Sequence, residues 1–280
     1  MTLQHNERTQ TRESNVQLNT TKTLARPAGL SLSHEQKGSY EMQMNVPLSS
    51  LKPQWNQAAR CLALIGGVIS PIAFVLIYTV AGILRPGYSP IHQAISDLGV
   101  GPYGWLLDTV AVMYGLLLIG FAVGFALSMR QVLNVGWRWF GAALLALRGL
   151  TLVTLGIFTE APATVRIHSL ASIAGLVSMI SAFIVIGIGL RRNSQWRGWG
   201  TYSLVTALVT LMLVEVEFWV FTPGTPLASA HLGGLMERLL YLETLAWYVV
   251  FGWRLFVLKG SRQQDREQEE TPLEMVEHKR

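Results

Sequence analysis

Four ionisable side chains are candidates for chemistry because they interrupt or border the apolar stretch that runs from residue 58 to residue 258. They are Asp97, Glu160, His168 and Glu237. A carboxylate or a neutral imidazole can take a proton from a reacting group, so this set has the residue types of general acid–base catalysis. Charged groups are costly in apolar membrane surroundings, so each one found there is a candidate functional residue.

Three histidines, His92, His168 and His231, are candidate metal ligands. Imidazoles combined with carboxylate oxygens are a ligand set that suits zinc. A bound zinc ion would suit a hydrolase in which a carboxylate is the general base. The sequence contains no H-E-x-x-H or similar local spacing, and such spacing is what makes a metal motif specific. Its absence favours the alternative, in which these histidines pair with carboxylates and with loop backbone.

The segment 89–99 has the pattern of a short helix at the membrane interface. Ser89 is a good N-cap, Pro90 suits the first helical position, and Gly99 can end the turn. Apolar residues recur between them at helical spacing. Asp97 lies in this segment and has two interpretations that stay open. It is a functional carboxylate, or it caps the segment by accepting hydrogen bonds from nearby backbone N–H groups.

Two buried ion pairs are predicted from the depth of charged residues in the apolar stretches. Arg148 and Glu243 lie roughly 16 Å and 12 Å deep at the helical rise per residue. Arg238 and Glu215, one turn nearer the outside, form the second predicted pair. Such pairs would fix helix register or line a polar cavity for a substrate or a proton. Arg148→Leu should harm folding, and Glu243→Leu added to it should partly rescue the protein.

The elements that must position these residues are six apolar stretches of membrane-spanning length. Only 14% of residues are charged, against about 25% in soluble domains. A helix crosses the hydrocarbon core with about 20 apolar residues and satisfies its backbone within the segment. The sequence therefore predicts an all-α, polytopic integral membrane bundle of six transmembrane helices. The predicted spans are 60–84, 105–128, 137–159, 167–190, 198–221 and 235–258.

Basic residues predict the orientation of the spans. The loops at 129–136 and 191–197, with their flanks, hold five Lys or Arg residues, whereas the loops on the other side hold Arg85 and Arg166 only. The positive-inside rule then places the first set of loops, and both termini, in the cytoplasm. Most ionisable residues of the apolar region consequently gather towards the outer face.

Polar tails flank the membrane domain. The predicted organisation is a disordered cytoplasmic tail at 1–57, the six-helix domain at 58–258, and a cytoplasmic tail at 259–280. The net charge of +5 comes from the tails and short loops. It indicates attraction to the headgroups of the lipid bilayer and no nucleic-acid partner.

The single cysteine, Cys61, excludes an intramolecular disulfide. Ala171 and Gly175 form a small-residue pair of the kind that lets helices approach closely.

Three features together resemble a known family. The segment Ile95-Ser96-Asp97-Leu98-Gly99 follows the first span, Glu160 and His168 bracket the third loop, and Glu237-Arg238 opens the last span. This pattern resembles domain-of-unknown-function family 998, a group of six-span prokaryotic integral membrane proteins, over about residues 58–258. The family often has Phe-Pro before the acidic residue where this chain has Phe158-Thr159. The resemblance implies a multi-pass plasma-membrane protein and brings no biochemical activity with it.

The predicted function is that of an integral membrane protein of unassigned biochemical role with a polar site open to the outer face. One alternative is a metal-assisted hydrolase at the outer leaflet, which would hold zinc. The other is a small-solute or proton-coupled transporter. Convergence of the outer-face histidines and carboxylates within a few ångströms would favour an enzyme, and their dispersal would favour roles in capping and helix register.

Overall fold

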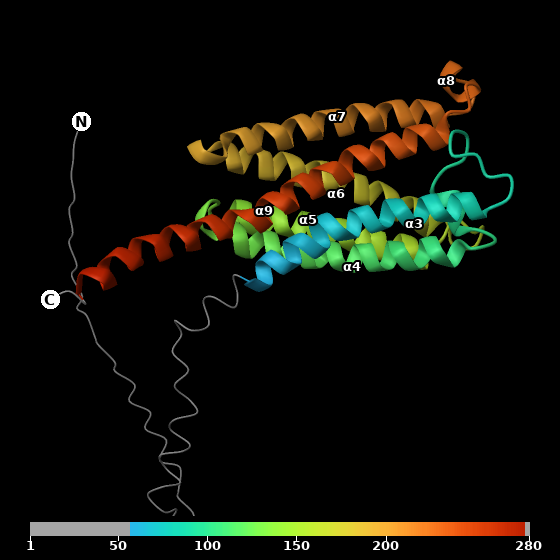
Figure 1. The fold of residues 1–280 in the computed structure, drawn as a ribbon. Helices are drawn as coiled ribbons and strands as arrows, with labels where there is room; N and C mark the ends of the chain where they lie inside the picture. The colour runs from blue at the N-terminus through green and yellow to red at the C-terminus, as the bar shows by residue number, and fades with distance from the viewer. Residues whose placement is uncertain (1–56, 278–280) are drawn as a thin grey trace, which may run out of the picture. The chain divides into compact units, whose positions relative to one another are not determined.

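The computed structural model describes the backbone of residues 57–277 and the side chains of residues 57–257. The predicted tail up to residue 56 and the side chains of the C-terminal tail lie outside these residues. Six long apolar helices lie alongside one another (Figure 1), and the described residues contain no strand, which confirms the all-α membrane fold. They are Gln57–Leu84, which includes α3 (Ser70–Leu84), α4 (Gly104–Ser128), α5 (Val135–Ile157), α6 (Val165–Arg191), α7 (Arg197–Phe221) and α9 (Gly233–Glu277).

The helices close into a ring, because each packs on the next along the chain and α9 packs back on the first helix and α3. The predicted spans agree with the observed helices to within a few residues, except at the end of α9. Its backbone stays helical to Glu277 rather than ending near residue 258. The added segment is rich in Glu, Gln and Arg, which are good helix formers, although it also contains Gly260 and Pro272, which are unfavourable inside a helix.

The first helix changes its winding where the chain carries Pro71. Residues Ile65–Ile69 form a π-helical turn, and the Ser70 backbone N–H bonds to the carbonyl of Ile65. Proline has no N–H to give to the carbonyl four residues back, so the ladder is already interrupted there. The Ser70 hydroxyl donates to the carbonyl of Gly66 at 2.8 Å, which satisfies one of the freed acceptors.

Glycines allow the closest helix crossings. A Cβ placed on Gly67 would lie 3.0 Å from the Cα of Gly252 in α9, and one on Gly115 of α4 would lie 2.5 Å from the carbonyl oxygen of Gly149 in α5. Only residues without a side chain permit backbones to approach this closely, as in other membrane bundles.

The outward faces of the helices remain strongly apolar. Large hydrophobic side chains are exposed along every span, among them Leu76, Leu116, Leu150, Val177 and Leu211. Soluble monomers rarely expose apolar surface on this scale, so lipid is the solvent that these faces fit. The interior is also apolar and rich in rings: Trp247 and Phe251 of α9 stack with centroids 4.8 Å apart.

Three connections share one end of the bundle, which we call the pocket end: residues 85–103, 158–164 and 222–232. The predicted helix over 89–99 is wrong in its first half. The chain makes one turn at Ser89–Gln93 and then a 3-10 helix at Ser96–Gly99. The carbonyls of Ile91, Gln93 and Ala94 accept hydrogen bonds from α9 and from Tyr88 instead of from the next helical turn. Tertiary contacts therefore replace the local pattern.

Candidate functional site

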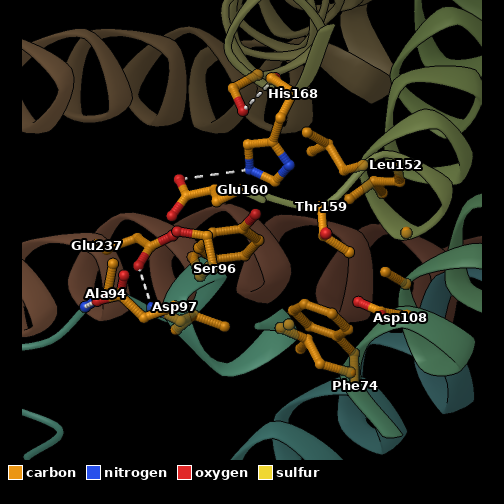
Figure 2. A pocket seen from close by; sticks show the side chains of 18 of the residues that line it. Phe74, Ala94, Ser96, Asp97, Asp108, Leu152, Thr159, Glu160, His168 and Glu237 are labelled. Carbon is orange, nitrogen blue, oxygen red and sulfur yellow. Dashed lines mark hydrogen bonds and ion pairs between the residues drawn. The ribbon is translucent and has the colours of Figure 1, made fainter. Parts of the chain in front are cut away.

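A cavity of about 490 Å³ opens at the pocket end (Figure 2), and we call it the pocket. Its walls come from the 85–103 loop, α3, α4, α5, the 158–164 loop, α6, α7 and α9. The structure brings all four sequence-predicted candidates to it, namely Asp97, Glu160, His168 and Glu237. Residues spread over 140 positions of the chain thus meet at one place, which depth along the helices alone does not require.

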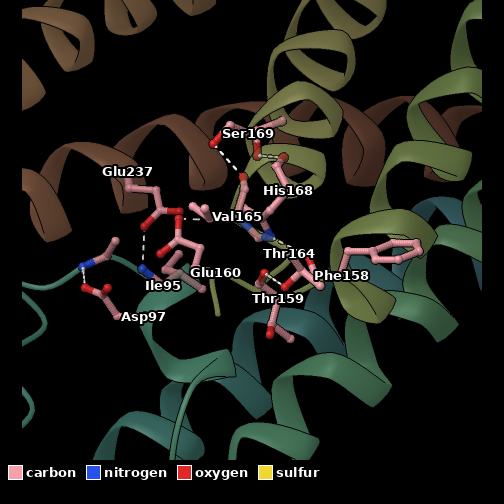
Figure 3. Close-up of polar contacts among 12 residues, drawn as sticks. Ile95, Asp97, Phe158, Thr159, Glu160, Thr164, Val165, His168, Ser169 and Glu237 are labelled. Carbon is pink, nitrogen blue, oxygen red and sulfur yellow. Dashed lines mark hydrogen bonds and ion pairs between the residues drawn. The ribbon is translucent and has the colours of Figure 1, made fainter. Parts of the chain in front are cut away.

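His168 and Glu160 form the most polar wall of the pocket. His168 Nε2 lies 3.6 Å from Glu160 Oε1, a separation longer than a hydrogen bond. His168 Nδ1 lies 2.8 Å from the carbonyl oxygen of Phe158 (Figure 3). A carbonyl only accepts, so Nδ1 carries a proton. In the neutral ring Nε2 therefore holds a lone pair directed at Glu160.

The 158–164 loop sets the distance within this pair. Phe158 ends α5, and its N–H bonds to the carbonyl of Thr154 at 2.8 Å. The Thr164 hydroxyl donates to the carbonyl of Thr159 at 2.6 Å, just before α6 begins. This turn returns the chain so that Glu160 faces the first turn of α6, where His168 lies.

Glu237 and Asp97 both accept hydrogen bonds from backbone N–H groups of the 85–103 loop. The Glu237 carboxylate accepts from the N–H of Ile95 (Figure 3), and Asp97 Oδ2 accepts from the N–H of Ala94 at 2.9 Å. Asp97 therefore has the capping contact that was one of its two predicted roles, and it also lines the pocket. Each carboxylate holds the loop through a backbone N–H and also lines the cavity.

Two further carboxylates, Asp108 of α4 and Glu217 of α7, also line the pocket. Neither was among the candidate site residues. Both lie near a helix end at the same depth as the candidates, and Glu217 faces nearly the opposite way from Glu215, as two positions of a helix must. The depth and angular position of Glu217 on its helix could have identified it as a pocket residue from the sequence. No feature of the sequence around Asp108 identifies it as one.

A family model described as "Protein of unknown function (DUF998)" matches residues 68–254. The chain belongs to the DUF998 family. No curated protein and no solved structure matches it. The match extends from the first span to α9, so every residue that lines the pocket of this DUF998 protein lies in the part that the family shares.

The predicted ion pairs are not formed in the part of the DUF998 protein that the structure describes. Glu243 accepts a hydrogen bond from the Thr210 hydroxyl at 2.8 Å, and Glu215 accepts from Trp219 Nε1 at 2.8 Å. No salt bridge joins Arg148 to Glu243 or Arg238 to Glu215, and the His168–Glu160 contact at 3.6 Å is an ion pair only when the ring is protonated. The depth argument failed because residues at equal depth can point in different directions around their helices.

Arg238 supports the 85–103 loop instead of pairing with Glu215. It donates to the carbonyls of Gln93 and Gly234 at 3.0 and 2.8 Å and to the hydroxyl of Tyr88. The Tyr88 hydroxyl in turn donates to the carbonyl of Ala94 at 2.7 Å. Arg238 is thus part of the frame behind the pocket rather than of its lining.

Arg148 is buried just below the pocket among aromatic and small residues. It is 6% exposed, and its charge acts on the hydroxyl of Tyr241, which itself lines the pocket. A Cβ on Gly175 of α6 would lie 2.3 Å from Arg148 Nη1. The predicted small-residue pair at Ala171 and Gly175 therefore has a specific use, since Gly175 makes room for a guanidinium group.

The histidines do not form a metal site among residues 57–257. No three His, Cys, Asp or Glu side chains in this range are arranged to hold a metal ion. His92 Nδ1 bonds the carbonyl oxygen of His231 at 2.7 Å and both rings are exposed, whereas His168 lies at the pocket. The predicted zinc ligands are thus divided between two places.

Proposed function

We propose that this DUF998 protein is a plasma-membrane transporter whose pocket admits a small solute from outside the cell, with both termini in the cytoplasm. The observation that carries the proposal is the convergence of Asp97, Glu160, His168 and Glu237 on one cavity. Pockets of 300–1,000 Å³ with apolar walls and a few polar groups are typical of small-molecule sites. Ionisable groups kept within a membrane domain are typical of substrate pathways.

The orientation is supported by basic residues at the end opposite the pocket. The guanidinium of Arg192 lies over Trp137, with Cζ 4.8 Å from the ring centroid, and that of Arg254 lies over Trp199 at 5.4 Å. Tryptophan marks a membrane interface on either side, and an excess of basic residues in short loops is typical of the cytoplasmic side. The pocket end would then face outward.

Transport is favoured over a one-sided receptor by the polar groups below the pocket. Arg148 Nη1 lies beside Gly175 of α6, and Ser172 and Leu176 of the same helix line the pocket. A buried cation with no carboxylate in an ion pair is costly in lipid, so a functional role for Arg148 beside the cavity would account for its presence there. A metal-assisted hydrolase has no comparable support among the described residues.

Cysteine labelling tests both orientation and transport. In a Cys61→Ser background, Ser172→Cys places a thiol in the pocket and Asn193→Cys places one at the opposite end. A membrane-impermeant maleimide should label Ser172→Cys in intact cells and also in inverted vesicles, because a transporter exposes its site to each side in turn. Asn193→Cys should react in inverted vesicles only.

The other outcomes each contradict a different part of the proposal. Labelling of Ser172→Cys from the outside alone would show a binding site that does not alternate, and transport would be rejected. Labelling of Asn193→Cys in intact cells would reverse the orientation.

A further inference from the structure

The pocket has an unusual balance of charge. Its lining contains five carboxylates and one histidine, with no lysine or arginine. If all were ionised, five negative charges would stand in apolar surroundings, a state that is relieved by a bound cation or by protons. The carboxylates are Asp97, Asp108, Glu160, Glu217 and Glu237.

His168 adds a requirement of a different kind. It is 8% exposed, and its Nδ1–H is used by the carbonyl of Phe158. Its Nε2 is 3.6 Å from Glu160 Oε1, which is longer than a hydrogen bond. In the neutral ring Nε2 is an acceptor that lacks a donor. A ligand that satisfies it must bring an N–H or O–H group.

The rest of the lining is apolar and aromatic. Phe74 and Tyr241 line one wall with ring centroids 5.6 Å apart, and Leu152, Leu176 and Phe221 line others. Ring faces attract cations, and aliphatic walls favour an apolar substituent on the ligand. A hydrated metal ion would use none of this surface.

We infer that the pocket binds a protonated primary or secondary amine that carries an apolar substituent. Its N–H groups donate to His168 Nε2 and to Glu160, and its substituent lies against Phe74 and Tyr241. This inference rests on the proposed function, in that the pocket must be reached from outside, and it names the chemical class of the solute.

Protection of a pocket cysteine tests the inference. Ser96→Cys, in the Cys61→Ser background, lies in the lining and should react with an impermeant maleimide in intact cells. Benzylamine should slow this reaction at least fivefold. Benzyl alcohol lacks the charge, benzyltrimethylammonium lacks the N–H, and phenylacetate has the opposite charge, so each should protect less than twofold at the same concentration.

Matched variants identify the groups responsible. Glu217→Gln removes one carboxylate from the lining and His168→Gln removes a proposed partner of the amine, so each should reduce protection by benzylamine. Glu215→Gln should keep it, because Glu215 is two positions from Glu217 and lies outside the pocket. Only variants whose purified protein is monodisperse are compared. If only one of the two pocket variants meets this condition, its comparison with Glu215→Gln is sufficient to test the inference.

The results separate the two proposals. Equal or better protection by benzyl alcohol, phenylacetate or benzyltrimethylammonium would overturn the amine inference and leave an outward-facing site intact. A reactive thiol that benzylamine does not protect would do the same. A thiol that does not react from outside would overturn both.

Discussion

Glu237 has two structural roles, since it anchors the 85–103 loop and lines the pocket. Its carboxylate accepts the N–H of Ile95, a residue 142 positions away, while also facing the cavity. The hydrogen bond fixes the orientation of the Glu237 carboxyl group in the cavity wall. Loss of the side chain would leave a buried N–H without an acceptor.

Glu237→Ala should therefore lower the free energy of unfolding by about 1–3 kcal/mol, the cost of an unsatisfied buried polar group. Glu237→Gln keeps an oxygen acceptor at the same reach and should lose less than half of this. The measurement is thermal unfolding in detergent. Equal loss in the two variants would mean that charge, not the hydrogen bond to Ile95, stabilises the loop.

Arg148 depends on the absence of a side chain at Gly175. Gly175→Ala should destabilise the protein by about 1–3 kcal/mol because the new methyl group overlaps the guanidinium. Gly198→Ala is the matched control, since a Cβ there meets nothing within 4 Å, and it should be neutral or stabilising by up to about 1 kcal/mol. Similar melting temperatures for the two variants would show that Arg148 can move aside at little cost.

The partner of Glu243 also decides the result of a double-mutant cycle. Arg148→Leu and Glu243→Leu should be additive in their effects on stability, because Glu243 bonds Thr210 and not Arg148. Thr210→Val with Glu243→Leu should show a coupling of about 1 kcal/mol or more, as groups in direct contact do. Coupling between Arg148→Leu and Glu243→Leu, with none between Thr210→Val and Glu243→Leu, would support the ion pair that was predicted from depth.

At the scale of elements, the 85–103 loop is held by tertiary contacts rather than by its own helix. The hydroxyl of Tyr88 bridges Arg238 on α9 to the carbonyl of Ala94. Burial raises the pKa of Tyr88, although the Arg238 guanidinium acts in the opposite direction. The phenol consequently stays protonated and keeps its role as a donor. Its contribution to stability is complete below the unfolded-state pKa and is lost as the pH rises through the higher folded-state pKa.

Tyr88→Phe should release the loop without unfolding the helices. We expect a loss of about 1–2 kcal/mol from the two hydrogen bonds and faster labelling of Ser96→Cys, since Ser96 lies in the same loop. Tyr103→Phe is the control, because Tyr103 is exposed and lies beyond the 3-10 helix. An unchanged labelling rate in Tyr88→Phe would show that the other loop contacts suffice.

At the scale of the described domain, six helices form a ring whose outer surface suits lipid and whose pocket end collects carboxylates. The glycine crossings between the first helix and α9, and between α4 and α5, bring the backbones close together. The pocket lies where the helices reach the end of this packed region. Alternating access would need the helices around Arg148 to separate at the end of the bundle opposite the pocket. The close glycine crossings would resist this movement, because the backbones are packed together there.

The sequence by itself determined the six spans, the DUF998 membership and the gathering of ionisable residues at one depth. Span length follows from the thickness of lipid, and depth follows from a fixed rise per residue, so both depend on position along the chain. Only the tertiary structure decided which residues face one another. These helices are apolar on nearly every face, so hydropathy carries little information on the direction in which each side chain points. Arg148 and Glu243 share a depth and do not pair, whereas Asp108 and Glu217 reach the pocket because of how their helices are rotated.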